Sequence, residues 1–509
     1  MRRTRGRRLA GLVAIAVLGL SATECSAGGA QPAGTSVLRI PAPNDAGSWD
    51  PAAHGASDLP TLGFFQAVFA MLTTIEPDQS IGPGLATSWS YDAPKTTLTM
   101  NLRSGVSFTD GTAFDASVVK QNLDRDLAAK GQAAISLAAI GQVSVASQYQ
   151  VVIKLNTPDP ALLYTFGLIP GAMISPRSFT AAATAPVGCG PYVLDAGQTT
   201  RGSTYVFTRN PKYNLPQKFG FDTVQYKVIT DTNAQVTALA SHQVDTGGVT
   251  APGLASVKSA GMSATGVSGL IVAMFIVDRA GTTNPALAKP QVRQALNYGL
   301  NATALLDSIG GKSGSRTTQM FAAGTPAYDA SLNSRYPYDP AKARQLLAEA
   351  GYPHGFTLQL PSENTYLPAL YPIVSQQLAQ IGVRVKYTPV SADQITAQYL
   401  SGKFPAFMFT YTATQNWLDV QSLLARTAPF NPFHVDDPTV SQLAGQIAVA
   451  GADQQATLLK QLNTYIVDQG WFAPLYVNTS YLVWDPRKVS ISLAKSQEFA
   501  YLYQYQPAR

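Results

Sequence analysis

The segment from residue 356 to residue 387 carries the pattern that most restricts the fold. Apolar and polar residues alternate from Phe356 to Leu360, which is the period of a half-buried strand. A stripe of apolar residues at helical spacing follows and ends at Gly382, and alternation returns from residue 383 to residue 387. A strand, a helix and a second strand in this order predict a β-α-β unit with parallel strands, and therefore an α/β fold.

Segments on both sides extend this pattern. Upstream, the dipeptide Asp339-Pro340 predicts the N-cap and first residue of a helix that Gly351 closes. Downstream, Ser391 followed three residues later by Gln394 predicts a capping box that opens another helix. Residues 405 to 411 then predict a third strand of the same parallel sheet.

A second group of elements is expected between residues 37 and 158. The alternating segments 37–40, 97–102 and 151–155 predict strands, and the apolar or helically spaced segments 62–72 and 114–127 predict helices. Residues 53 to 158 are therefore expected to form one mixed unit.

The charge of the chain is concentrated at its N-terminus. A pI near 9.0 and a net charge of +6 are typical of nucleic-acid binders, but five arginines lie within the first eight residues and an apolar run, Leu9 to Leu20, follows them. That arrangement is typical of a secretory signal. Without residues 1–24 the chain carries about +2, so nucleic acid is not expected as a partner. The apolar run spans about 18 Å, too short for a membrane core of about 30 Å.

Cys25 lies where a bacterial lipoprotein signal places the thiol that receives diacylglycerol. The preceding residues resemble a lipobox, although Glu24 stands where that motif has a small residue. We therefore expect a signal peptide over 1–24, lipidation at Cys25 and a flexible tether over 25–36, rich in Gly, Ala and Ser. The alternative is ordinary cleavage near residues 27–30, which releases a soluble protein.

Seven short motifs follow one another along the chain: Ile81–Trp89, Leu102–Thr112, Pro186–Tyr192, Arg209–Tyr213, Val292–Leu296, Tyr338–Gly351 and Leu378–Val385. In this order they resemble the family 5 extracellular solute-binding proteins of ABC importers, which include oligopeptide, dipeptide and nickel binders. One departure is Cys189, which replaces the family's usual Thr.

The resemblance implies a two-lobed periplasmic-binding-protein-like fold, type II and similar to cluster C, with an extra domain in the first lobe. Ligand is enclosed between the lobes, and two strands form the hinge. Residues 269–278 and 471–476 are the expected hinge crossings. In this numbering we expect the first lobe in 37–52, 159–268 and 471–509, the extra domain in 53–158, and the second lobe in 269–470.

Three motif positions have structural explanations. Gly188 and Gly190 predict a tight chain crossing, because glycine tolerates close backbone approach. The pair Asp110-Gly111 predicts a hairpin turn. Arg293, on an expected helix, either pairs with a carboxylate across a lobe or lies on a solvated face.

Enzyme interpretations each lack a necessary part. The sequence has no Gly-x-Ser-x-Gly elbow, and Leu306 stands where a phosphate loop ending at 310–313 needs its opening Gly. The four histidines lie far apart in the sequence, without metal-ligand spacing: His54, His242, His354 and His434. We therefore expect no enzymatic activity, no cofactor and no protein-built metal site. Nickel carried by a small chelator stays open as a ligand.

Residues 409 to 419 bear on the ligand. In peptide-binding relatives the matching stretch supplies an aromatic residue and, three positions on, an Asp for the ligand's α-ammonium. Tyr411 keeps the aromatic, but Thr414 occupies the place of the acid and cannot supply the opposite charge that a buried ammonium needs. Asp419 or Glu363 would have to supply it from a shifted position; the other interpretation of Asp419 is an acid at a helix N-terminus.

Aromatic rings at the ends of expected strands suit sugar faces or apolar side chains. The candidate ligand-binding residues are Tyr366, Tyr411, Thr414, Asn416, Trp417, Asp419 and Trp471. Sugars, modified peptides and chelators therefore compete with simple peptides as ligands.

The sequence thus predicts an exported monomer, lipid-anchored at the outer face of the cytoplasmic membrane or free in the periplasm or cell envelope. It would capture a peptide-like or other small polar solute and deliver it to ABC permease subunits. The alternative is an envelope solute sensor or scaffold with the same fold and no transport role.

Overall fold

A computed structural model describes residues 36–508, apart from 310–312, 364–366, 392–393, 414, 494–496 and 498–499. Residues 36–509 form one compact unit by their internal contacts. The expected signal peptide, Cys25 and the tether up to residue 35 lie outside the described residues, and Ser36, the last residue of the expected tether, is bonded to Asp222. No helix in the described part of the chain is both long and apolar enough to cross a membrane.

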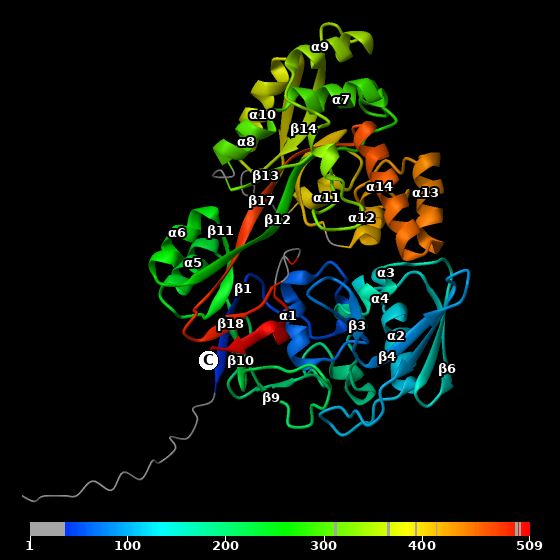
Figure 1. Ribbon diagram of the computed structural model, residues 1–509, viewed down its shortest axis with the longest axis vertical. Helices are drawn as coiled ribbons and strands as arrows, with labels where there is room; N and C mark the ends of the chain where they lie inside the picture. The colour runs from blue at the N-terminus through cyan, green and yellow to red at the C-terminus, as the bar shows by residue number, and fades with distance from the viewer. Residues whose placement is uncertain are drawn as a thin grey trace, which may run out of the picture. The chain divides into compact units, whose positions relative to one another are not determined.

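Two four-stranded sheets are built from the first half of the chain (Figure 1). In the first, β1 (Val37–Ala42) pairs in parallel with β10 (Thr223–Val228), and the sheet continues through β9 (Thr204–Arg209) to β8 (Tyr192–Leu194). The second is antiparallel in the order β4 (Ala86–Tyr91), β5 (Thr97–Leu102), β7 (Gln150–Leu155), β6 (Ile140–Ser147). The strands predicted at 37–40, 97–102 and 151–155 are confirmed.

A five-stranded sheet contains the two longest strands. Its order is β11 (Thr246–Thr250), β17 (Phe472–Trp484), β12 (Ser263–Ile276), β16 (Ala406–Tyr411), and β13 (Gly314–Arg316) also pairs with β17. Strands β12 and β17 are antiparallel from the pair Ser263–Trp484 to the pair Phe275–Phe472, and they run side by side in Figure 1. The segments predicted as hinge crossings lie in or beside these two strands.

The β-α-β unit of residues 356–387 is confirmed. Strands β14 (Phe356–Ser362) and β15 (Val383–Pro389) are parallel, and α10 (Leu370–Ala379) connects them. Gly382 has a φ of 88°, which a glycine adopts without steric cost. Upstream, Asp339 caps α9 (Pro340–Glu349) by accepting a bond from the Lys342 amide, as the sequence predicts.

Two predictions for the following segment are wrong. Strand β16 pairs antiparallel with β12 rather than joining β14 and β15, because its hydrogen-bond partner is a strand more than 100 residues upstream. The next helix, α11 (Ile395–Tyr399), has Gln394 as its N-cap residue and no side-chain capping bond, so the capping box at Ser391 does not form.

The remaining elements cover these sheets and connect them. The helices are α1 (Leu59–Val68), α2 (Ala116–Ala128), α3 (Gln132–Ser136), α4 (Leu162–Thr165), α5 (Thr232–Ala240), α6 (Ala251–Ser259), α7 (Pro290–Gly299), α8 (Ala302–Ile309), α12 (Asn416–Leu423), α13 (Pro438–Val449) and α14 (Ala452–Asp468). The short strands are β2 (Thr73–Ile75), β3 (Ile81–Pro83), β18 (Val489–Ile491) and β19 (Tyr505–Pro507). The helices predicted at 62–72 and 114–127 correspond to α1 and α2, although α1 ends at Val68.

Successive residues of β12 face two different cores. Ile271, Ala273 and Phe275 pack with buried residues of α12, α13 and α14, whereas Val272 and Met274 pack with α7, α9, α10 and β14. This period of two is the geometry of a strand buried on both faces. The part of the five-stranded sheet that β12 and β16 form is therefore a central layer between two groups of helices.

The glycines of the Pro186–Tyr192 motif allow the chain to cross the end of α1. A Cβ on Gly188 would lie 2.0 Å from the Val68 carbonyl oxygen, and one on Gly190 would lie 2.5 Å from the Val68 carbonyl carbon. Between them, Cys189 is a buried free thiol. The predicted close approach is confirmed.

Arg293 fits neither interpretation offered by the sequence. It is 3% exposed, and its guanidinium donates to the carbonyl oxygens of Gln469 at 2.9 Å and Leu287 at 2.7 Å. Burial lowers the pKa of this guanidinium to about 10. Backbone carbonyls and the Gln469 side-chain oxygen, rather than a carboxylate, accept the hydrogen bonds of this guanidinium.

Candidate functional site

The end of β16 and the start of α12 bring Tyr411 and Asp419 together. The Tyr411 hydroxyl donates to Asp419 Oδ1 at 2.9 Å, and both side chains are buried. Burial, together with the neighbouring Asp419 carboxylate, raises the pKa of Tyr411 far above its usual range. Asp419 lies in the first turn of α12, which agrees with its interpretation as an acid at a helix N-terminus.

The N-terminus of α12 is held by side-chain caps. Gln415 is the N-cap residue, and its side-chain oxygen accepts bonds from the amides of Trp417 at 2.7 Å and Leu418 at 3.1 Å. The Asn416 Oδ1 accepts a bond from the Ala327 amide at 2.9 Å. Asn416 is thereby fixed beside Ala327, and Trp417 packs in the same buried cluster as Ala327.

Asp159 faces this helix from the segment that follows β7. It is 6% exposed and accepts a bond from the Ala161 amide at 2.9 Å. Burial raises the pKa of its carboxyl to about 6, and the nearby Trp417 side chain opposes that rise. Ala161 packs in the same buried cluster as Trp417. The sequence analysis missed Asp159, since nothing in its local pattern indicates a partner more than 200 residues away.

A recess opens beside this cluster, between β12, β13, β17 and the segments that follow β13 and β16. Its walls include the polar residues Arg316, Thr317, Tyr328 and Asn333 and the apolar residues Phe321 and Ala413. Ala413 belongs to the stretch 409–419 that the sequence singles out for ligand binding. Tyr328 adjoins Ala327, which is bonded to Asn416.

The ladder between β12 and β17 is irregular at this recess. The pairing shifts between Ser268 and Ile271 and again between Val272 and Ala273. Gly269 lines the recess, and a Cβ there would lie 2.2 Å from the Asn478 carbonyl oxygen. Such irregularities bend a strand pair locally.

The other candidates have different surroundings. Trp471 is 3% exposed and stacks on Arg279, whose guanidinium carbon lies 4.1 Å from the centre of the ring. Glu363 is buried, and its Oε1 accepts a bond from the Leu367 amide at 2.9 Å. Thr414 and Tyr366 lie outside the described residues. The structure thus brings Tyr411, Asn416, Trp417 and Asp419 together.

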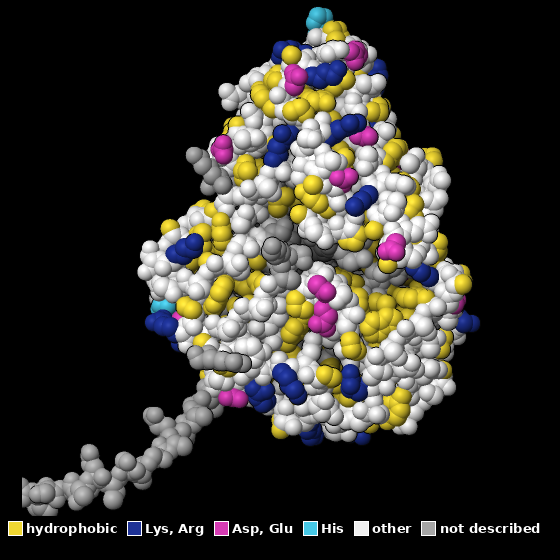
Figure 2. Space-filling view, in the orientation of Figure 1, with side chains coloured by type: hydrophobic (Ala, Val, Ile, Leu, Met, Phe, Trp, Pro, Cys, Tyr) yellow, Lys and Arg dark blue, Asp and Glu magenta, His cyan; other side chains and the backbone are white. Residues whose placement is uncertain are grey.

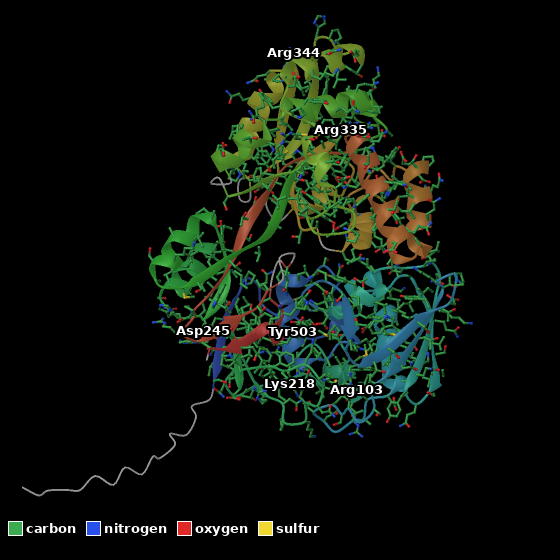
Figure 3. All side chains as sticks on the ribbon, viewed as in Figure 1. Arg103, Lys218, Asp245, Arg335, Arg344 and Tyr503 are labelled. Carbon is green, nitrogen blue, oxygen red and sulfur yellow. The ribbon has the colours of Figure 1, made fainter. Side chains whose placement is uncertain are left out.

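A second recess lies elsewhere, with a mainly apolar lining that includes Phe69, Met71, Tyr213 and Tyr503. Tyr503, labelled in Figure 3, donates its hydroxyl hydrogen to the Ile75 carbonyl oxygen at 2.9 Å. This recess has no charged lining residue, whereas the recess beside β13 is lined by Arg316 and by Ala413 of the stretch 409–419. The recess beside β13 is therefore the better candidate site.

Metal ligands do not converge in the described part of the chain: no group there of three or more His, Cys, Asp or Glu side chains has a suitable arrangement. Charged side chains of both signs are dispersed over the face shown in Figure 2. What the recess offers a small molecule is therefore one cation, hydrogen-bonding side chains and apolar walls.

Comparison with known proteins adds independent information. Residues 80–428 match the family described as bacterial extracellular solute-binding proteins, family 5 Middle. The glutathione-binding protein GsiB of Pectobacterium atrosepticum is 30% identical over 375 residues, which cover 69% of this chain and 68% of that protein. GsiB of Salmonella typhimurium is 28% identical over 447 residues, covering 81% and 83%.

Solved structures agree in fold. NikA from Brucella suis in complex with Fe(III)-EDTA has a TM-score of 0.77 at 23% identity, covering 92% of this chain and 99% of NikA. DppA from Helicobacter pylori in complex with the peptide STSA has a TM-score of 0.75 at 20% identity, covering 93% and 98%.

Proposed function

Because this chain belongs to the family 5 bacterial extracellular solute-binding proteins, we propose that it captures a peptide-like solute outside the cytoplasm and delivers it to an ABC permease. The α/β, two-lobed fold of this family is the architecture predicted from the sequence. The observation that carries the proposal is the recess lined by Arg316, Tyr328 and Ala413, which lies beside the buried cluster of candidate residues from the stretch 409–419.

The peptide-like character of the solute rests on the relatives. The two GsiB proteins are named for binding glutathione, a tripeptide with two carboxylates. The recess suits such a solute, because it combines polar side chains with the apolar surfaces of Phe321 and Ala413. Candidate contacts are Tyr411, Thr414, Asn416, Trp417, Asp419, Tyr366 and Trp471.

Hinge closure is the mechanism we propose. A solute that touches both lobes favours the closed state by its difference in affinity for the two states. Strands β12 and β17 are suited to be the hinge, since they are long and their pairing is interrupted at the recess. The protein binds and releases the solute without breaking a covalent bond.

The proposed lobes keep the boundaries stated above: 37–52, 159–268 and 471–509 for the first, 53–158 for its extra domain, and 269–470 for the second. Separate buried clusters support this division, one around β1, β9 and β10, another around β4 to β7, and two on the faces of β12 and β16. Helix α1 packs in the first of these clusters, so the extra domain shares a core with its lobe.

The N-terminal proposals concern residues that the structure does not describe. A signal peptide over 1–24 and a lipid on Cys25 would keep the protein at the outer face of the cytoplasmic membrane. Mass spectrometry of the mature N-terminus tests this proposal: a diacylglycerol on Cys25 supports the anchor, and cleavage beyond residue 25 contradicts it. We also propose that the protein is a monomer.

A melting-temperature screen tests the proposed function. The panel holds glutathione, free dipeptides and tripeptides, their N-acetylated forms, oligosaccharides and nickel chelates. A ligand at 100 times its dissociation constant stabilises the folded state by about 2.7 kcal/mol. Peptides are expected to raise the melting temperature. Acetylation of the peptide amine is expected to change the shift in melting temperature little, because Thr414 provides no carboxylate for an ammonium. If the shift disappears on acetylation, the protein recognises the free ammonium, and the interpretation of Thr414 is wrong.

A further inference from the structure

We infer that the recess between β12, β13 and β17 binds a carboxylate of the solute and that Arg316 is the cation that pairs with it. The inference rests on the proposed function and deepens it, since it names the charge that the solute must carry. Nothing in the family match or in the names of the relatives assigns a role to Arg316.

Arg316 is a half-buried cation, and no acidic side chain among the described residues pairs with it. Its Nη2 donates to the Tyr336 carbonyl oxygen, and its Nε has no hydrogen-bond partner within the part of the chain that the structure describes. Burial alone lowers the pKa of the guanidinium, with no carboxylate acting against that change. A partly desolvated charge of this kind is stabilised by a bound anion.

Two acidic side chains lie next to the residues that surround Arg316, and both have other partners. Asp329 follows Tyr328 and accepts a bond from the Ser331 amide at 2.9 Å, and Asp468, which acts on Tyr336, pairs with Arg335 at 2.7 Å. Neither lines the recess that Arg316 lines. Within the described part of the chain, Arg316 therefore lines a pocket without a paired carboxylate.

A second donor lies in the same recess. Asn333 Nδ2 donates to the Tyr328 hydroxyl oxygen at 2.7 Å, and that bond leaves the hydrogen of the hydroxyl for another acceptor. Asn333 is itself oriented by the Gln319 amide, which donates to its Oδ1 at 2.9 Å. A carboxylate has two acceptor oxygens, so it suits a guanidinium and a hydroxyl that line one pocket.

The apolar walls of the recess indicate which group of the solute lies next to its carboxylate. Phe321, Ala413 and Ile271 provide apolar surface in the same recess. A short aliphatic stem that ends in a carboxylate, such as the C-terminal residue of a peptide, matches this combination. Free anions such as phosphate would use the cation but not the apolar walls.

Calorimetric titration of matched ligands tests the inference. Each peptide that binds the wild-type protein is compared with its C-terminal amide, and glutathione is compared with its glycyl ethyl ester. The proteins are the wild type, Arg316→Gln and Arg316→Lys. A charge-assisted hydrogen bond corresponds to about a 10- to 100-fold change in affinity.

The matched control is Arg344→Gln. Arg344 lies on α9, is exposed and donates to the Gln380 carbonyl oxygen, and Figure 3 labels it at the top of the view, away from β13 and β17. Its replacement removes the same charge from the same protein without touching the recess. Melting curves of all variants show whether each one is folded.

The expected result has three parts. Wild type loses at least about tenfold in affinity when the carboxylate is masked. Arg316→Gln binds the free acid as weakly as wild type binds the amide and no longer distinguishes the two, and Arg316→Lys keeps part of the preference. Arg344→Gln behaves as wild type.

Two results would overturn the inference in distinguishable ways. If peptides bind but neither masking the carboxylate nor Arg316→Gln in a folded protein changes the affinity, the recess is not the carboxylate subsite and the proposed function stands. If wild type binds no member of the panel, the proposed function fails, and the assignment of Arg316 fails with it.

Discussion

At the scale of single residues, Asp159 shows how tertiary structure changes a side chain's chemistry. An isolated Asp titrates near 4, but burial raises the pKa of this carboxyl to about 6, even though the Trp417 side chain opposes that rise. Above that pH the folded protein must hold a charge in a poorly solvated place. Asp159 therefore lowers the free energy of unfolding at neutral pH.

We predict that Asp159→Asn is more stable than wild type at pH 8 by about 1 to 3 kcal/mol. The advantage shrinks as the pH falls through 6 and is absent near pH 4, because wild type then binds the proton in the folded state. Urea unfolding at several pH values measures this difference. Asp124→Asn, on the exposed face of α2, is the control and should change stability by less than about 0.5 kcal/mol. Equal stability of Asp159→Asn and wild type at pH 8 contradicts the prediction.

The residues of the candidate site differ in how far the sequence could identify them. Tyr411 and Asp419 belong to one stretch, so their proximity follows from a strand end joined to a helix start. Arg316 has no local signal: its recess is formed by segments that are distant in the sequence, such as Gly269, Ala413 and Val477. Only the fold brings these residues together.

At the scale of elements, local sequence patterns predict whether a segment is a helix or a strand. They predict less well which other strand or helix that segment pairs with. The unit β14, α10 and β15 was predictable, because its parts are consecutive and the connection requires parallel strands. Strand β16 has an equally clear pattern, yet its partner β12 is distant in the sequence. Arg293 lies on a predictable helix, but its carbonyl partners come partly from residue 469.

We predict that Gly188→Ala destabilises the protein by about 3 kcal/mol, because its Cβ would collide with the backbone at the end of α1. Chemical denaturation measures the loss. The control is Gly445→Ala in α13, where a Cβ meets no atom within 4 Å. It should gain about 0.5 to 1 kcal/mol from its higher helix propensity. If Gly188→Ala were as stable as wild type, the crossing would not be as close as the structure has it.

At the scale of the whole molecule, the well-packed part of the five-stranded sheet and the irregular part of its strand pairing lie in different places. Helices pack on both faces of the five-stranded sheet around β12 and β16, whereas the interrupted pairing of β12 and β17 lies at the recess. Rigid bodies joined by a few strands are suited to opening and closing around a solute. The family resemblance predicted this architecture from the sequence, while the ligand's charge follows from the side chains that the fold assembles.

Isothermal titration calorimetry of the wild-type protein with the peptide panel tests the central claim most directly, because it separates binding from turnover in one trace. The account predicts heats that decline to saturation at one peptide per chain. A constant thermal power that continues until the peptide is consumed would reveal catalysis and contradict the account, and so would the absence of saturable heat with every member of the panel.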